Sequence, residues 1–114
     1  MHEYSLVEAL VRRVEEEARR RGATAVHGLT VSLGELSGVD PELFRTAYET
    51  FRAGTLCQAA PLTLTVFAAR WSCPRCQAEI PRGAALRCPA CGLPARMAER
   101  SDALMLESVD MEVP

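Results

Sequence analysis

The sequence predicts an α+β fold in which two helices cover a small three-stranded mixed sheet, with a cysteine-rich ribbon inserted between the second and third strands. Apolar residues recur at helical spacing in two segments and alternate at strand spacing in three others. Two CxxC pairs lie between the last two of these strands. We therefore expect residues 1–70 and 101–114 to form an α/β core domain and residues 71–100 to form the ribbon domain.

The composition is that of an ordinary globular protein with one modest core. The 114 residues are 48% apolar and 25% charged, which excludes a disordered or fibrous chain. No apolar run approaches the roughly 18 residues of a membrane span. The first residues include the acidic Glu3 and Glu8 rather than a basic, apolar leader. We expect a cytoplasmic protein, in which reduced thiols favour metal binding over disulfides.

The first helix is expected over residues 6–21. Ser5 followed by Glu8 fits a capping box, and Gly22 can adopt the left-handed conformation that ends a helix. This start leaves residues 1–4 outside the helix. The expected core stripe recurs every three or four residues: Leu6, Val7, Leu10, Val11, Val14 and Ala18.

Residues 29–33 alternate between apolar and polar side chains, which predicts a strand with one buried face. Asp40 as N-cap and Pro41 at the first helical position open a second helix, which ends before Gly54. Its expected core side chains are Leu43, Phe44, Ala47, Tyr48 and Phe51.

Residues 62–70 are rich in β-branched and apolar side chains and predict the second strand. The third strand closes the chain. Val109 and Met111 share one parity, whereas Leu104 and Leu106 have the other. Because a strand has a period of two residues, we expect a bulge or break near Glu107.

The two CxxC pairs, separated by eleven residues, have the spacing of one tetrahedral thiolate site. Four cysteines leave no open position for water or substrate, so the metal would be a structural zinc. A pair of disulfides or a redox CxxC fits less well, since neither pair opens a helix after a strand. Cys57 is expected to be a buried small hydrophobe. The predicted zinc ligands are Cys73, Cys76, Cys88 and Cys91.

Met1, His2 and Glu3 are unremarkable inside a chain. At a free terminus they offer an α-amine, a backbone amide nitrogen and an imidazole, which suit square-planar Ni(II) or Cu(II). Taken alone, a histidine at position two is usually a disordered terminal residue. The context changes this interpretation.

The opening MHEYS together with the late CPRC and CPAC motifs closely resembles the hydrogenase maturation nickel metallochaperones of the HypA/HybF family. The resemblance spans the whole chain. It implies a non-enzymatic metallochaperone with His2 as nickel ligand, assisted by the Met1 amine and backbone near Glu3. It also implies zinc at Cys73, Cys76, Cys88 and Cys91.

The resemblance further implies a hydrogenase maturation GTPase and a hydrogenase large-subunit precursor as partners, with urease maturation proteins in some organisms. The oligomeric state stays open, with a homodimer among the alternatives. Some relatives recruit a further histidine near the zinc domain, but the only other histidine here is His27, far from the knuckles in sequence. We expect His27 at a sheet edge or in a loop.

The rival interpretation is a nucleic-acid-binding zinc ribbon, supported by five arginines between Arg70 and Arg96 and by Trp71 as a stacking residue. It does not explain the MHE terminus, and a net charge of −2 argues against a protein devoted to binding phosphate. We therefore expect no nucleic-acid partner. A metal-dependent hydrolase fails because four cysteines leave no open metal position.

Overall fold

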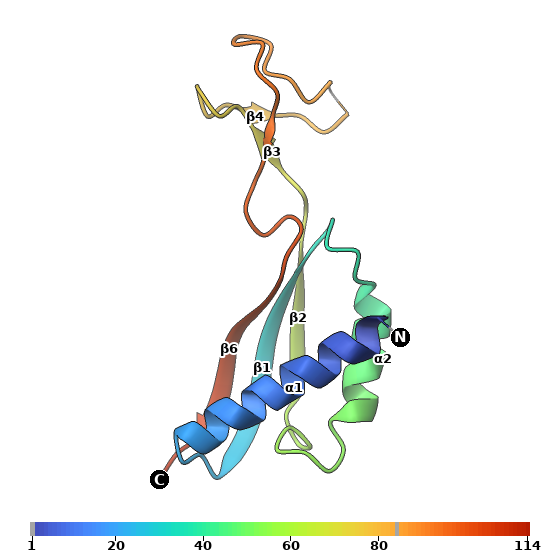
Figure 1. The fold of residues 1–114 in the computed structure, drawn as a ribbon, viewed down its shortest axis with the longest axis vertical. Coiled ribbons are helices and arrows are strands. Elements are labelled where there is room, and N and C mark those ends of the chain that lie inside the picture. The colour runs from blue at the N-terminus through green and yellow to red at the C-terminus, as the bar shows by residue number, and fades with distance from the viewer. Residues whose placement is uncertain (1, 84) are drawn as a thin grey trace.

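The computed structural model describes residues 2–83 and 85–114, and for His2 the backbone alone. The molecule is elongated, with extents of 55 × 30 × 16 Å. Figure 1 shows a helix-and-sheet core at one end and the cysteine-rich ribbon at the other. Within the described part of the chain, no helix has the length and apolar character needed to cross a membrane.

The first helix, α1, spans His2–Arg20, so the expectation that residues 1–4 lie outside it was wrong for residues 2–4, while Met1 lies outside the described residues. Two tertiary contacts explain the extra turn. The Glu3 side chain is buried, and its carboxylate accepts a hydrogen bond from the backbone amide of Asp40 at 3.3 Å. The Tyr4 ring packs edge-on against the Phe51 ring, with the two ring centroids 5.5 Å apart. Ser5 and Glu8 are therefore inside the helix and form no capping box, because contacts with α2 extend the helix beyond the local signal.

The C-terminal end of α1 and both ends of α2 follow the sequence prediction. Gly22 has φ +68°, and the amides of Gly22 and Ala23 donate to the carbonyls of Arg19 and Ala18 at 3.1 and 2.8 Å. This is a Schellman termination. The second helix, α2, spans Pro41–Phe51, and the Asp40 carboxylate caps it.

The core sheet consists of β1 (Ala25–Gly34), β2 (Leu62–Phe67) and β6 (Leu104–Glu112), in the order β2-β1-β6. β1 pairs parallel with β2 and antiparallel with β6, which confirms the mixed sheet. The second strand ends at Phe67 rather than at residue 70. The pairing with β6 shifts between Thr30 and Val31, which confirms the bulge at Glu107, and a second shift occurs at His27.

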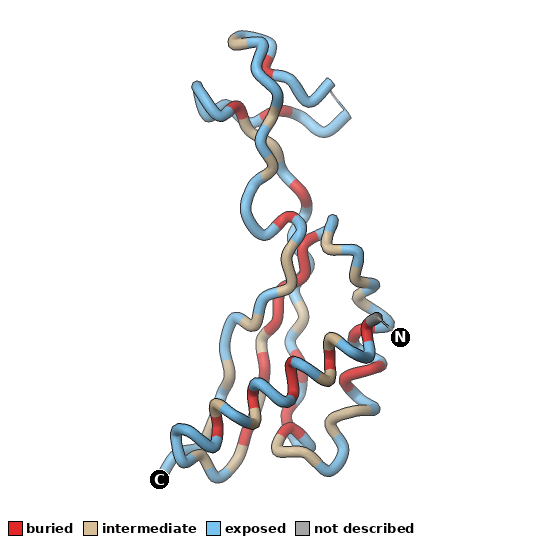
Figure 2. The backbone as a smooth tube through the Cα atoms, in the orientation of Figure 1, coloured by how far each residue is buried: buried red, intermediate tan, exposed pale blue. Residues whose placement is uncertain are grey.

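One hydrophobic cluster joins the helices to one face of the sheet. Figure 2 shows the buried positions along the inner side of α1 and the length of β1. Leu29, Val31 and Leu33 of β1 face the helices, and five of the six predicted α1 side chains are buried, with Leu6 partly so. In α2, Leu43 is exposed and Phe51 partly buried, whereas the remaining predicted core residues are buried.

The ribbon contains three short strands, β3 (Trp71–Ser72), β4 (Glu79–Ile80) and β5 (Arg96–Met97), in the order β4-β3-β5. It lies between β2 and β6 in the chain, as predicted. Its own small cluster consists of Cys73, Ile80 and Cys88. So few buried side chains cannot stabilise a sheet of this size without a further constraint.

The chain leaves and re-enters the core at a narrow waist beside Gly34. The Gly34 amide donates to the Ala103 carbonyl at 2.8 Å, and the Leu36 amide donates to Ser101 at 2.8 Å. A Cβ atom on Gly34 would lie 2.1 Å from the Arg100 carbonyl oxygen. Only glycine permits this approach, because the atoms that a side chain would meet are backbone atoms of Arg100 and Ser101, which the hydrogen bonds of the waist hold in place.

We predict that Gly34→Ala lowers the free energy of unfolding by about 3 kcal/mol because of this overlap. The matched control is Gly28→Ala in the same strand, where the nearest atom to an added Cβ is a carbonyl oxygen 3.8 Å away. Urea unfolding of both variants checks the prediction, and equal stability of the two would contradict it.

Candidate metal centres

The two CxxC segments fold into two knuckles with similar hydrogen-bond patterns. In the first, the amides of Arg75 and Cys76 point at the Cys73 sulfur at 3.4 and 3.5 Å. The Gln77 amide donates to the Cys73 carbonyl at 2.9 Å. Two backbone amides therefore point at the Cys73 sulfur, an arrangement suited to a thiolate.

The second knuckle resembles the first, with one amide rather than two directed at its leading sulfur. The Cys91 amide points at the Cys88 sulfur at 3.4 Å, and the Gly92 amide donates to the Cys88 carbonyl at 2.8 Å. The fourth residue after each leading cysteine has a left-handed backbone, with φ +64° at Gln77 and +71° at Gly92. Glycine meets this requirement without strain, whereas Gln77 adopts it at a cost.

All four predicted cysteines converge on one point. Their sulfur atoms lie within 4.8 Å of one another, and the Cys76 and Cys88 sulfurs are 3.8 Å apart. A tetrahedral zinc with Zn–S bonds of about 2.3 Å places its sulfurs about 3.8 Å apart. Two sulfurs come from each knuckle. The arrangement suits a structural zinc site with no position left for a substrate.

The sulfurs differ in their acidity. The amide of Cys76, aided by that of Arg75, lowers the pKa of the Cys73 thiol to about 6. Burial and the neighbouring sulfurs raise the pKa of the Cys91 thiol to about 12. Four thiolates this close repel one another, so the site favours full ionisation only when a cation offsets their charge.

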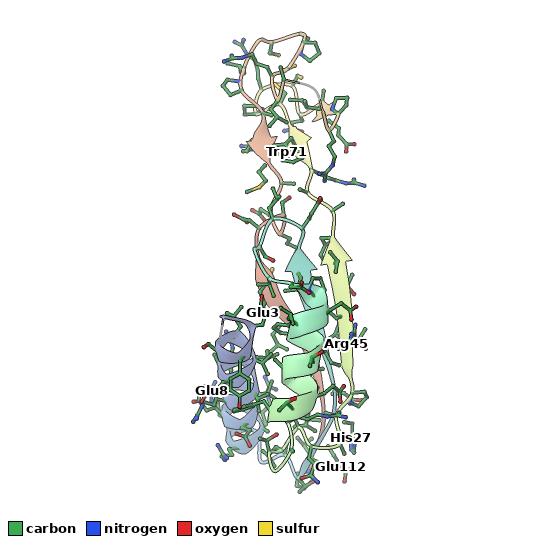
Figure 3. The ribbon with its side chains drawn as sticks, turned by 90° about the vertical axis from the view of Figure 1, so that its right-hand side faces the viewer. Glu3, Glu8, His27, Arg45, Trp71 and Glu112 are labelled. Atoms are coloured by element: carbon green, nitrogen blue, oxygen red, sulfur yellow. The ribbon has the colours of Figure 1, made fainter. Side chains whose placement is uncertain are left out.

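The amino-terminal site can be placed only in part. The His2 backbone starts α1, whereas Met1 and the His2 side chain lie outside the described residues. Glu3 anchors this end of the helix against the start of α2. Figure 3 shows Glu3 beside α2, with Trp71 in the ribbon above. The predicted nickel residues therefore come from a different part of the molecule than the four cysteines.

The remaining cysteine and the second histidine lie outside the four-cysteine cluster. Cys57 is fully buried in the core cluster, as predicted, and burial raises the pKa of its thiol. His27 is exposed on β1, and its Nε2 lies 2.9 Å from a Glu112 carboxylate oxygen. Figure 3 shows this pair at the end of the sheet away from the ribbon. Among the described residues, metal-ligand side chains gather in groups of three or more only at the four cysteines.

Sequence reasoning missed the polar junction between core and ribbon. The Glu35 carboxylate accepts the Ala69 amide at 2.8 Å and forms a bidentate ion pair with Arg82 of the ribbon. The Ala69 amide, followed by Arg82, lowers the pKa of Glu35. The same guanidinium lies 5.5 Å from the Trp71 ring centroid. The partners are far apart in sequence, so no local pattern could have revealed the junction.

Known proteins match this chain over nearly its whole length. A family model described as "Hydrogenase/urease nickel incorporation, metallochaperone, hypA" matches residues 1–111. The hydrogenase maturation factor HypA of Shewanella oneidensis is 35% identical over 113 residues, covering 98% of this chain and 96% of its own. The HypA protein of Aquifex aeolicus is 33% identical over 114 residues, covering 99% of each. The solution structure of the Ni metallochaperone HypA from Helicobacter pylori aligns with a TM-score of 0.71 at 28% identity, covering 98% of both chains.

The fold, the four-cysteine centre and these matches define the class of protein: a nickel metallochaperone that serves nickel incorporation into hydrogenase and urease. Within that class, the chain belongs to the HypA family.

The two knuckles lead to a prediction that compares their left-handed residues. Gly92→Ala forces a Cβ into a conformation that costs about 1 kcal/mol, so zinc loss to a chelator should be about fivefold faster. Gln77→Gly removes strain, so zinc loss should be unchanged or slower. Chelator competition followed by absorbance checks both variants. Equal acceleration in the two would show that the left-handed backbone is not the cause.

Proposed function

We propose that this chain binds Ni(II) at its amino terminus and delivers it to a [NiFe] hydrogenase precursor. The observation that supports this most is the sequence Met1-His2-Glu3 at the start of a chain that matches the family over residues 1–111. The nickel donors are the Met1 amine, backbone nitrogen near Glu3 and the His2 imidazole. Such nitrogen donors suit a square-planar Ni(II) ion.

Residues 1–70 and 101–114 act as the nickel-binding core domain, and residues 71–100 act as the zinc ribbon domain. Support for this division comes from the separate hydrophobic clusters and sheets of the two parts. In the ribbon, Cys73, Cys76, Cys88 and Cys91 hold zinc. Its role is structural: it holds together a ribbon that buries few side chains of its own.

The partners we propose are a hydrogenase maturation GTPase, the hydrogenase large-subunit precursor and, in some organisms, urease maturation proteins. They follow from the family resemblance, and the protein acts in the cytoplasm without catalysing a reaction. The Glu3 carboxylate holds the first turn of α1 against the start of α2, so the proposed nickel residues adjoin an anchored helix.

A test of the zinc assignment uses Cys88→Ser. Purified protein should carry one zinc per chain, and the variant should lose it. The ribbon should unfold while the core persists, because structural zinc contributes on the order of 10 kcal/mol to small domains. Two-dimensional NMR with metal analysis measures both effects. Cys57→Ser is the control that alters a thiol outside the cluster and should retain zinc. A folded, fully reduced and metal-free wild-type protein would contradict the assignment.

The nickel assignment is tested with untagged protein that begins at Met1. His2→Ala and an amine-acetylated wild type should each abolish stoichiometric nickel binding, since each removes one nitrogen donor of the fused chelate. Isothermal titration and the visible spectrum of Ni(II) report the loss. His27→Ala is the matched histidine control and should bind nickel normally. Unchanged affinity in the acetylated protein would mean that side chains alone form the site.

A further inference from the structure

β6 forms one free edge of the core sheet, and a groove runs along it. Among the strands that the structure describes, β6 pairs with β1 alone, so its other side is open. The groove has a volume of about 540 Å³ and is lined by Glu17 and Arg21 of α1 and by residues 106–111 and Val113. Figure 1 shows the C-terminal half of α1 crossing beside β6. An extended strand with an open edge is a template for strand addition.

The sheet pairing determines which β6 amides face outward. The Leu29 amide donates to the Pro61 carbonyl, so Leu29 directs its backbone groups away from β6. Its antiparallel partner Val109 is therefore in a non-hydrogen-bonded pair, with its amide directed to the free edge. The backbone carbonyl of Glu112 points toward β1, since it accepts a hydrogen bond from the Thr24 amide at 2.9 Å. Because backbone groups alternate along a strand, the amide of the preceding residue, Met111, points to the free edge.

The two faces of this edge differ in chemistry. Val109 and Met111 are partly buried and pack against the core on the helix side. Asp110 and Glu112 are exposed on the opposite face. The nearby Glu107 carboxylate is neutralised by Arg100 at 2.6 Å, and the groove's Arg21 is paired with Glu17 at 3.1 Å. Within the described residues, no arginine forms an ion pair with Asp110 or Glu112. Glu112 lies 2.9 Å from the His27 Nε2, which is charged only when protonated, and Asp110 has no ion-pair partner among these residues, so the open face carries negative charge when His27 is neutral.

We propose that β6 binds an extended segment of a partner protein as a fourth strand, with apolar side chains alternating with basic ones. The apolar side chains would lie in the groove beside Val109 and Met111, and the basic ones beside Asp110 and Glu112. A second copy of β6 fits less well, because it would bring the same two acids onto the same face. The regular stretch is residues 108–112, beyond the Glu107 bulge. The proposal requires no nickel.

The test uses zinc-loaded full-length protein and an eight-residue fluorescent peptide of alternating valine and lysine, at concentrations where the peptide is monomeric. Two further peptides carry N-methyl groups on the valines only or on the lysines only. Each methylated peptide has the charge and side chains of the parent peptide, but it lacks the N–H donors along one of its two edges. In an antiparallel addition the valine amides face β6, and in a parallel addition the lysine amides do.

The parent peptide should bind, and one methylated peptide should bind at least tenfold more weakly while the other matches the parent. Met111→Pro removes an outward amide and should weaken binding at least tenfold, whereas Met111→Ala keeps that amide and should change it less than threefold. Asp110→Lys should weaken binding, whereas Glu99→Lys, with the same change of net charge, should not. Circular dichroism verifies that each variant is folded.

Three results would overturn the proposal. The parent peptide could fail to bind. Both methylated peptides could bind as tightly as the parent, which would mean that attraction between charges suffices. The protein could also be a dimer by sedimentation that Met111→Pro converts to a monomer, which would mean that a second copy occupies the edge. If Met111→Pro does not fold, the methylated peptides decide the question.

Discussion

The backbone ladders on both sides of β1 hold this molecule together. β1 pairs parallel with β2 and antiparallel with β6, and its apolar face carries both helices. The last residue of β1, Gly34, also contacts the segment by which the ribbon returns to the core. One strand therefore organises the sheet, the hydrophobic cluster and the waist. A residue with a side chain at Gly34 would force apart two backbone segments that the fold requires to touch.

The waist connects the core and the ribbon, which are stabilised by different interactions. The core depends on apolar burial, whereas the ribbon has a small cluster and a set of sulfurs that require a cation. Between them lie Glu35, Arg82 and Trp71, which combine an ion pair with a cation–π contact. These contacts are exposed, so each stabilises weakly. Their main effect is to set the orientation of the ribbon relative to the core, rather than to stabilise the ribbon's own fold.

The two proposed metal centres place opposite demands on the chain. A structural zinc needs four sulfurs fixed by knuckles, with no open position for exchange. A nickel ion in transit needs donors that a partner can replace, and terminal amine and imidazole groups suit that exchange. The helical start at His2, anchored by Glu3, gives these donors a defined base.

The sequence by itself determined the elements with strong local signals. The Asp40-Pro41 start of α2, the Gly22 stop of α1 and the two knuckles depend on neighbouring residues, so spacing sufficed to predict them. The parity change that predicted the Glu107 bulge is local as well. The family resemblance of the MHEYS and CxxC motifs supplied the nickel function, which no periodicity could indicate.

Tertiary structure decided what depends on residues far apart in the chain. The first turn of α1 forms because Glu3 reaches Asp40 and Tyr4 reaches Phe51, contacts that outweigh the capping signal at Ser5. The ion pair of Glu35 with Arg82 and the close approach at Gly34 likewise join distant segments. The outward direction of the β6 amides follows from pairing register. Local sequence carries none of this, because each contact forms only after the sheet brings its partners together.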